Sequence, residues 1–420
     1  MKQSFVKNRW YYLGGILILF ILLFEAKGEG DFHIFMSASK DLLAGKNIYT
    51  ELYHEWYHYY YNIVFALILA PFSFVPFYLA KLFWLLLNVF FVYRTWKIIR
   101  NWLPVETLTK KGKVIFYVLT FLIMLRFLRD NFHTAQMTIL ILYLSLEGLN
   151  LIDQRKIVWG SFLIALAIDI KLLPILLIIY LVYRNQWKAA LLVVGFIVVL
   201  LFLPAIFIGV DYNNFLLAER WDLINPSNHE HVLDTTERSF HSLTSLLATL
   251  LVENSGDTYA LPVKRNIADI SLEKLGLVIN VCRLGLIVFA LYFLRSWPFK
   301  ASSNNLQKLY ELSYIFLVIP LIFPHQQHYA FYFIFPAVAY VVYFFVSRFI
   351  LDDEFKKSKN FLTKKITFIA ALAIIYFLTN SHFILGTFKN FYDHFKTLTY
   401  GILLLLLVLA LCRPKRLKLD

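Results

Sequence analysis

The chain has 420 residues, of which 60% are hydrophobic and 16% charged, and its formal net charge is +14. A soluble domain of this length carries about a quarter charged residues, so the composition excludes an ordinary soluble protein. No soluble domain remains to present the basic charge to nucleic acid, and we expect no nucleic-acid partner. The excess of Lys and Arg instead predicts basic cytoplasmic loops of a protein embedded in a lipid bilayer.

Apolar runs recur along the whole chain and are continuous rather than alternating, which favours helices over a barrel. We expect one membrane domain over residues 1–420, an all-α polytopic bundle of about 11–13 transmembrane or half-membrane helices. The candidate spans are about 10–25, 76–96, 114–129, 135–152, 186–207, 275–295, 309–323, 329–348, 365–380 and 398–412.

The N-terminus is basic and leads into the first span without a small-residue cleavage site. This pattern predicts an uncleaved anchor with a cytoplasmic N-terminus, so residues 26–61 form the first outer loop. Cys282 and Cys412 both lie in apolar runs, and they predict neither a disulfide framework nor a zinc site.

The region 62–96 leads to a basic loop at 94–113, which the charge rule places inside. It must therefore cross the bilayer once, although it is long. Pro71 and Pro76 interrupt it, because proline removes a helix donor and clashes with the preceding turn. We expect a short helix over 62–74 at the outer surface, followed by one span.

The segment 158–183 has basic residues at both ends, which places both ends inside. Two helices of about 12 residues would rise only about 18 Å each, too short for a hydrocarbon core of about 30 Å. The segment is predicted to enter and return as a hairpin, with Lys171 and Pro174 near its tip. The large loop 208–274 then lies outside, and the C-terminal tail lies inside.

On this topology the unusual polar and aromatic residues gather on the outer side. Ionisable groups in membrane segments are costly and usually mark a pathway or a site. The residues are Asp31, His33, Tyr53, His54, Trp56, Tyr57, His58, Tyr59, Tyr60, Tyr61, Arg126, Arg129, Asp130, Asn131, His133, Gln136, Lys171, Glu237, Arg238, His241, His325, Gln326, Gln327 and His328.

Several of these residues also have a structural interpretation. Asp31 is a favoured type of helix N-cap, the tyrosines suit an interfacial aromatic belt, and Arg126 and Arg129 can extend to the membrane surface. Lys171 is harder to explain in this way, because it lies between apolar runs and Asp169, two residues away, does not face it on one helix. His325 and His328 without a nearby carboxylate are a weak metal signal, and we expect no metal and no cofactor.

The chemistry of a lipid-linked sugar phosphate fits this set. Its phosphate needs cations such as Lys171, with Arg126 or Arg129 as further candidates. The attacking hydroxyl needs one general base within hydrogen-bond reach, and Asp31 at the membrane surface is the candidate. The departing phosphate needs electrostatic stabilisation and no acid, so a single catalytic carboxylate suffices.

Four stretches of the chain resemble the polyprenol-phosphate-sugar-dependent glycosyltransferases of the GT-C fold, specifically the alpha-mannosyltransferase-like glycosyltransferase family 87. They are Asp31-Phe32 with Ala38, Leu42, Gly45 and Tyr49; Tyr61 to Asn88 with Pro71, Pro76, Ala80 and Trp84; Gly160 to Trp187 with Lys171 and Pro174; and Pro324-His325-Gln326-Gln327-His328. The chain departs from the family at Ala135-Gln136, where Gly-Gln is usual, at Tyr61-Asn62, and at the two glutamines that separate its late histidines.

The resemblance implies that Asp31 is the catalytic base. It also implies that Lys171 and the late-loop histidines contact the donor phosphate or sugar. The predicted donor-binding residues are Lys171, Arg126, Arg129, Gln136, His325, His328 and Tyr61. The expected reaction is transfer of a hexose, with mannose favoured, from a polyprenyl-phosphate donor to a lipid or glycan acceptor at the outer face of the plasma membrane, with inversion and without metal.

Two alternatives stay open at this point. One is a GT-C transferase for another group, such as an aminosugar moved onto lipid A-type acceptors, which these residues do not distinguish. The other is a transporter or flippase for the lipid-linked sugar. A transporter is expected to place its charges near the bilayer midplane, often between inverted repeats. The sequence has no internal repeat, and its charges gather on one predicted face.

Overall fold

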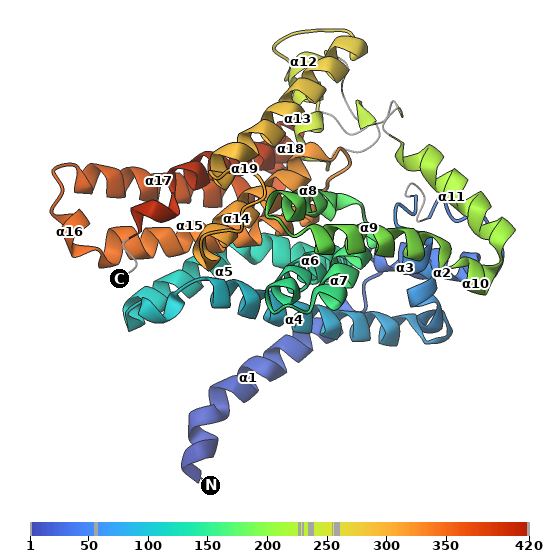
Figure 1. Cartoon of the computed structure of the whole chain (residues 1–420), viewed down its shortest axis with the longest axis horizontal. Helices are drawn as coiled ribbons and strands as arrows, with labels where there is room; N and C mark the ends of the chain where they lie inside the picture. The colour runs from blue at the N-terminus through green and yellow to red at the C-terminus, as the bar shows by residue number, and fades with distance from the viewer. Residues whose placement is uncertain are drawn as a thin grey trace.

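The computed structural model describes residues 2–53, 58–225, 228, 231–233, 239–253, 255 and 261–417, with side chains from residue 12 onward except at 383 and 416. Helices dominate these residues (Figure 1). In the first half they are α1 (Lys2–Glu25), α2 (Phe32–Leu43), α3 (Ile63–Leu69), α4 (Phe77–Trp102), α5 (Lys110–Thr134), α6 (Thr138–Asp153), α7 (Ile157–Ile170), α8 (Leu176–Tyr183) and α9 (Trp187–Phe202). The second half contains α10 (Ala205–Ile208), α11 (Val210–Ile224), α12 (Leu243–Leu251), α13 (Leu272–Leu294), α14 (Asn305–Ile322), α15 (Phe335–Phe345), α16 (Asp353–Lys356), α17 (Phe361–Asn380), α18 (Lys389–His394) and α19 (Thr397–Leu411).

Among the described residues, five helices are long and apolar enough to cross a membrane, and no strand is present. A sixth is added if Gly386–His394 and Thr397–Leu411, bent by 68° at their junction, count as one span. The five are Phe77–Trp102, Trp187–Ile208, Leu272–Leu294, His328–Leu351 and Phe361–Asn380. The prediction of an all-α polytopic membrane protein is therefore confirmed, whereas the total of 11–13 helices remains a prediction.

Pro71 and Pro76 shape the segment before the first of these five helices. α3 is followed by a 3-10 turn over Ala70–Phe74 that has Pro71 in its first turn, and Pro76 directly precedes α4. The short helix expected over 62–74 and the separate span after it are both present. Proline separates them because it is tolerated in the first turn of a helix but not in its interior.

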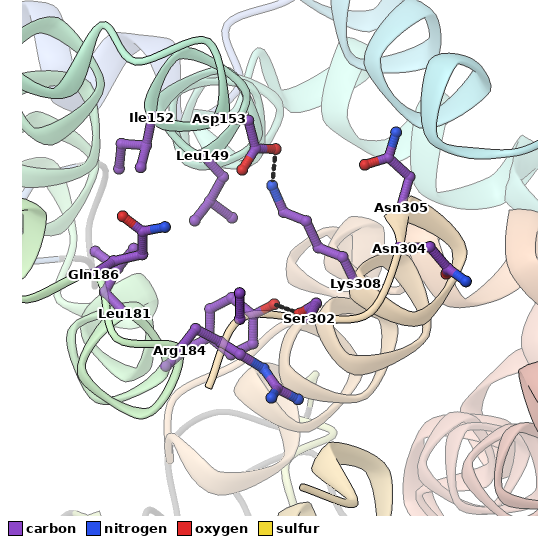
Figure 2. A pocket seen from close by; sticks show the side chains of 12 residues that line it. Leu149, Ile152, Asp153, Leu181, Arg184, Gln186, Ser302, Asn304, Asn305 and Lys308 are labelled. Atoms are coloured by element: carbon purple, nitrogen blue, oxygen red, sulfur yellow. Dashed lines mark hydrogen bonds and ion pairs between the residues drawn. The ribbon is translucent and has the colours of Figure 1, made fainter. Parts of the chain in front are cut away.

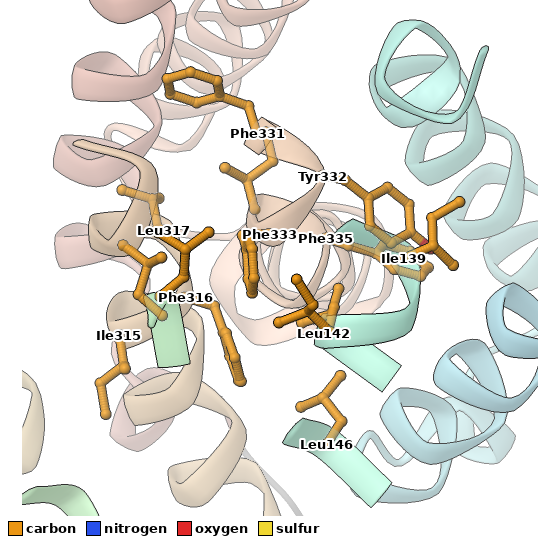
Figure 3. Close-up of a cluster of buried hydrophobic side chains, with 14 of the residues drawn as sticks. Ile139, Leu142, Leu146, Ile315, Phe316, Leu317, Phe331, Tyr332, Phe333 and Phe335 are labelled. Carbon is orange, nitrogen blue, oxygen red and sulfur yellow. The ribbon is translucent and has the colours of Figure 1, made fainter. Parts of the chain in front are cut away.

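The centre of the bundle is formed by α14, α15 and the turn His328–Ile334 between them. The apolar stretch of His328–Leu351 is 78% buried, against 11–33% for the other four candidate spans. Figure 3 shows Phe316 and Phe333 packed together beside Leu142 of α6. A helix that is apolar all round and buried all round belongs in the interior, and the more exposed apolar helices are suited to face lipid.

α7 and α8 form a hairpin, as their contacts at both ends indicate. Near the start of α7, Ser161 Oγ donates to the carbonyl of Ala189 in α9 at 3.1 Å. At the end of α8, Arg184 pairs with Glu311 of α14. The break between the two helices, at Lys171, lies instead beside Tyr61, which precedes α3. The segment 157–183 therefore runs toward Tyr61 and returns.

α6 and α7 approach each other through two glycines. A Cβ placed on Gly160 would lie 2.5 Å from the carbonyl oxygen of Gly148, and one on Gly148 would lie 2.7 Å from that of Gly160. We expect Gly160→Ala to lower the free energy of unfolding by about 1–3 kcal/mol, because backbone must move to admit the methyl group. Gly195→Ala in α9, where a Cβ meets nothing within 4 Å, is the matched control and should be neutral or stabilising. Thermal unfolding in detergent measures both, and equal midpoints would contradict the packing argument.

Candidate active site

Asp31 lies in the short connection between α1 and α2 and directly precedes α2. Its backbone is in the helical region (φ −67°, ψ −13°), and its side chain makes no capping hydrogen bond. Its carboxylate instead accepts a hydrogen bond from the side-chain amide of Gln136. The N-cap interpretation is thus not realised, and the carboxylate is directed at a partner 105 residues away in the sequence.

Gln136 links Asp31 to Tyr61. It follows Ala135, whose left-handed backbone (φ 53°) terminates α5, and it is buried. Its amide nitrogen donates to Asp31, and its amide oxygen accepts from the Tyr61 hydroxyl at 3.2 Å. An amide suits this place because it has a donor and an acceptor on opposite sides.

Tyr61 is fixed by the loop around it. Its carbonyl accepts from the hydroxyl of Tyr49 at 3.1 Å, and its ring meets that of Phe35 edge-on at 4.9 Å. The next residue, Asn62, is the N-cap of α3 and donates to Asp169 of the hairpin. Burial, and secondarily the charge of Asp31, raise the pKa of Tyr61 above its ordinary value, so its hydroxyl stays a donor at neutral pH.

Lys171 completes the group from the hairpin. The chain becomes extended there (φ −150°, ψ 128°), which ends α7 and turns the side chain toward Tyr61. The ammonium lies 5.5 Å from the centre of the Tyr61 ring, within the range of a cation–π interaction. Four of the predicted site residues, Asp31, Tyr61, Gln136 and Lys171, therefore lie together, and we call them the Asp31 group.

Arg126 and His328 lie in a second cluster, centred on Asp130. Arg126 Nε and His328 Nε2 are each 3.4 Å from Asp130 Oδ2. Arg126 is 1% exposed and donates to the carbonyl of Thr379 at 3.0 Å and to the hydroxyl of Tyr392 at 2.7 Å. Arg126 would have to leave these partners to bind a donor phosphate. Arg129, by contrast, has a side chain that is 55% exposed, 3.8 Å from Asp130.

His325 lies in neither group but in a cluster of aromatic rings formed with His231, Phe240 and Tyr60. Its Nε2 is 3.2 Å from Nδ1 of His231, and its ring lies 5.0 Å from that of Phe240 and 6.0 Å from that of Tyr60. A backbone hydrogen bond joins the two segments that carry Phe240 and His325, because the amide of His241 donates to the carbonyl of Gln326 at 2.9 Å. Burial lowers the pKa of His241 to about 4, so it is neutral at physiological pH.

Some predicted residues fall outside these groups. His54, Trp56, Tyr57, Glu237 and Arg238 lie outside the described residues. Within the part of the chain that is described, no three His, Cys, Asp or Glu side chains are grouped to hold a metal ion. His382 and Asp393, 3.6 Å apart, join the second cluster and carried no sequence signal, because they come more than 250 residues after Arg126.

A cavity of about 160 Å³ with charged side chains in its lining opens at the far end of α8, away from Lys171 (Figure 2). Its charged lining is internally paired: Lys308 bonds to Asp153, and Arg184 bonds to Glu311 at 2.6 Å. These pairs leave little net charge to attract an ionic ligand. The Asp31 group, whose ammonium faces a ring and whose carboxylate meets a neutral amide, is the better candidate for chemistry on a charged substrate.

Lys81 is a buried residue that is not among the predicted site residues. It is the only charged residue between Pro76 and Arg94, and that isolation within an apolar run was a usable signal. It is fully buried in α4 and close to the loop that carries Asp31.

The model of glycosyltransferase family 87 matches residues 59–324, which is more than half of the chain. The matched region contains Tyr61, Gln136 and Lys171, but it begins after Asp31 and ends before His325. No curated protein matches the chain.

Proposed function

Since the chain belongs to glycosyltransferase family 87 and has several membrane-spanning helices, we propose that it transfers a hexose, in the first place mannose, from a polyprenyl-phosphate donor to a lipid or glycan acceptor. The observation that carries the proposal is the meeting of Asp31 and Lys171 around Gln136 and Tyr61. A base and a cation in one site are what sugar transfer from a phosphate leaving group requires.

The proposed reaction is a single displacement. The acceptor hydroxyl oxygen attacks the anomeric carbon, and Asp31 takes its proton. The bond between that carbon and the phosphate oxygen breaks, and the electron pair leaves with polyprenyl phosphate. Attack opposite the leaving group inverts the configuration. Lys171 stabilises the charge that develops on the phosphate, and the Tyr61 hydroxyl and Gln136 hold Asp31 in place.

The proposal includes a location. The basic loops favour cytoplasmic termini in a plasma membrane, with the loop 26–61, the hairpin tip and the loop 208–274 on the opposite face. The contacts support this arrangement, because residues predicted on one face meet in the Asp31 group. Residues from segments predicted on the other face meet at Glu311. In this proposal residues 1–420 form one membrane-embedded domain of the GT-C type, which has the Asp31 group toward one face and the contacts of Glu311 toward the other.

The test uses purified protein in nanodiscs with radiolabelled polyprenyl-phosphate-mannose and a pool of lipid and glycan acceptors, in parallel samples with and without EDTA. We expect label in the acceptor fraction and release of polyprenyl phosphate, and no transfer from a nucleotide sugar. Transfer only from another polyprenyl-phosphate sugar would support the proposed reaction type and would contradict mannose as the transferred sugar. Loss of transfer on adding EDTA would reject the metal-free mechanism. Passage of intact donor across the bilayer without cleavage would replace the enzyme with a transporter.

A further inference from the structure

Lys81 is a fully buried lysine whose ammonium donates to backbone carbonyls. Its Nζ lies 2.6 Å from the carbonyl oxygen of Gly28, 3.4 Å from that of Glu29 and 3.4 Å from that of His133. No carboxylate among the described side chains forms an ion pair with it. An ammonium has three N–H donors, and here there is one carbonyl for each.

These carbonyls belong to the two segments that carry Asp31 and Gln136. Gly28 and Glu29 lie just before Asp31, and His133 lies in the last turn of α5, three residues before Gln136. The cation is favourable at this position because a helix C-terminus presents carbonyls without intrahelical partners and a partial negative charge. Lys81 therefore bonds to both sides of the Asp31–Gln136 contact at once.

Two further contacts hold the same pair of segments. Gly30 has a left-handed backbone (φ +59°), and a Cβ there would lie 3.0 Å from the Cα of Thr134, so the two backbones touch. Trp84, one turn after Lys81 on α4, donates its indole N–H to the carbonyl of Ala135 at 3.1 Å. α4 thus supplies two donors that hold the segments on either side of the Asp31–Gln136 hydrogen bond.

We propose that Lys81 is a positioning residue for the transfer reaction, fixing the Asp31 carboxylate against Gln136 so that it points at the acceptor hydroxyl. This inference rests on the proposed role of Asp31 as the base. The geometry matters because a displacement of about 1 Å in a reacting group can cost about 100-fold in rate. A residue that served stability alone would affect folding without a selective effect on turnover.

The test compares Lys81→Met with Lys308→Met. Both lysines are buried, but Lys308 lies at the Glu311 end and bonds to Asp153. In Lys81→Met we expect kcat to fall about 10- to 100-fold while KM for the donor changes less than about two-fold. Lys81→Arg, which keeps donors and charge, should recover part of the loss. Lys308→Met should show no such selective loss of kcat. Wild-type kcat in Lys81→Met, or an equal loss in both variants, would overturn the proposal.

A second readout separates this inference from the proposed function. Hydrogen exchange of the amides at residues 31–36 should speed up in Lys81→Met and not in Lys308→Met. Unchanged exchange would overturn the positioning role whatever the activity. In an Asp31→Asn background, Lys81→Met should cause little further loss, because a positioning residue acts through the group it positions. A fully additive loss would overturn it as well. An active Asp31→Asn protein would reject the base assignment, while the exchange result would still report whether Lys81 holds the loop.

Discussion

Replacing Asp31 with asparagine is expected to lower kcat by a factor of about 10² to 10⁴, the range that general-base catalysis supplies. The amide is nearly the same size and can still meet Gln136, but it cannot accept the proton of the acceptor hydroxyl. Donor binding should persist, since Lys171 and Tyr61 are unchanged. The measurements are initial transfer rates with saturating polyprenyl-phosphate sugar, and donor affinity by equilibrium binding.

Two further variants serve as comparisons for the Asp31→Asn result. Asp41→Asn is the matched control, because Asp41 lies on the same helix, α2, where it bonds to Lys46 at 3.0 Å and to the Tyr53 hydroxyl at 3.1 Å. It should leave kcat near that of the wild type. Lys171→Met should weaken donor binding, which Asp31→Asn leaves intact, and it should also lower kcat because Lys171 is proposed to stabilise the departing phosphate. Transfer that persists undiminished in Asp31→Asn would remove Asp31 from the chemistry and leave it as part of the loop.

Replacing Arg184 with methionine is expected to destabilise the protein by about 3–5 kcal/mol, because it leaves a buried carboxylate without its cation. Glu311 is buried and bonded on both oxygens: Arg184 contacts it at 2.6 and 3.0 Å, with further bonds from Tyr180, Ser302 and Gln307. These bonds join the end of the hairpin to α14. Denaturant titration in mixed micelles, followed by fluorescence, measures the change.

The controls for this prediction distinguish the loss of an ion pair from the effect of leaving one buried charge without its partner. Arg184→Met combined with Glu311→Leu removes both charges and should recover much of the stability, since replacing a whole buried pair by apolar residues is often neutral. Lys356→Met disrupts an exposed pair with Asp353 and should leave stability nearly unchanged. Equal effects of Arg184→Met and Lys356→Met would show that the buried pair is not what holds this end together.

The local part of the fold could be predicted from the sequence. The apolar runs at 76–96, 186–207, 275–295, 329–348 and 365–380 all correspond to helices that pass the test for a membrane span. Helix formation in lipid depends on the segment itself, because its backbone must satisfy its own hydrogen bonds. Asp31 and Lys171 were also identifiable, because each is a charge beside or within apolar sequence. Lys81 had the same signal.

The grouping of side chains could not be predicted in the same way. Arg126 and Lys171 were assigned to one phosphate site, yet Arg126 bonds to Thr379 and Tyr392, 253 and 266 residues away, and Lys171 faces Tyr61. Which of these contacts form depends on how each helix is rotated and on which helices pack beside it. That information is not contained in any single apolar run.

The sequence by itself determined that the chain is a bundle of membrane helices and which charges are exceptional within them, because the length and polarity of each segment are local properties. Only the tertiary structure decided that Gln136 and Tyr61, rather than Arg126 and His328, accompany Asp31 and Lys171. It also decided that Lys81 bonds to the segments on both sides of that group. The physical reason is that a buried polar group must find its partners wherever packing brings them, at any distance along the chain.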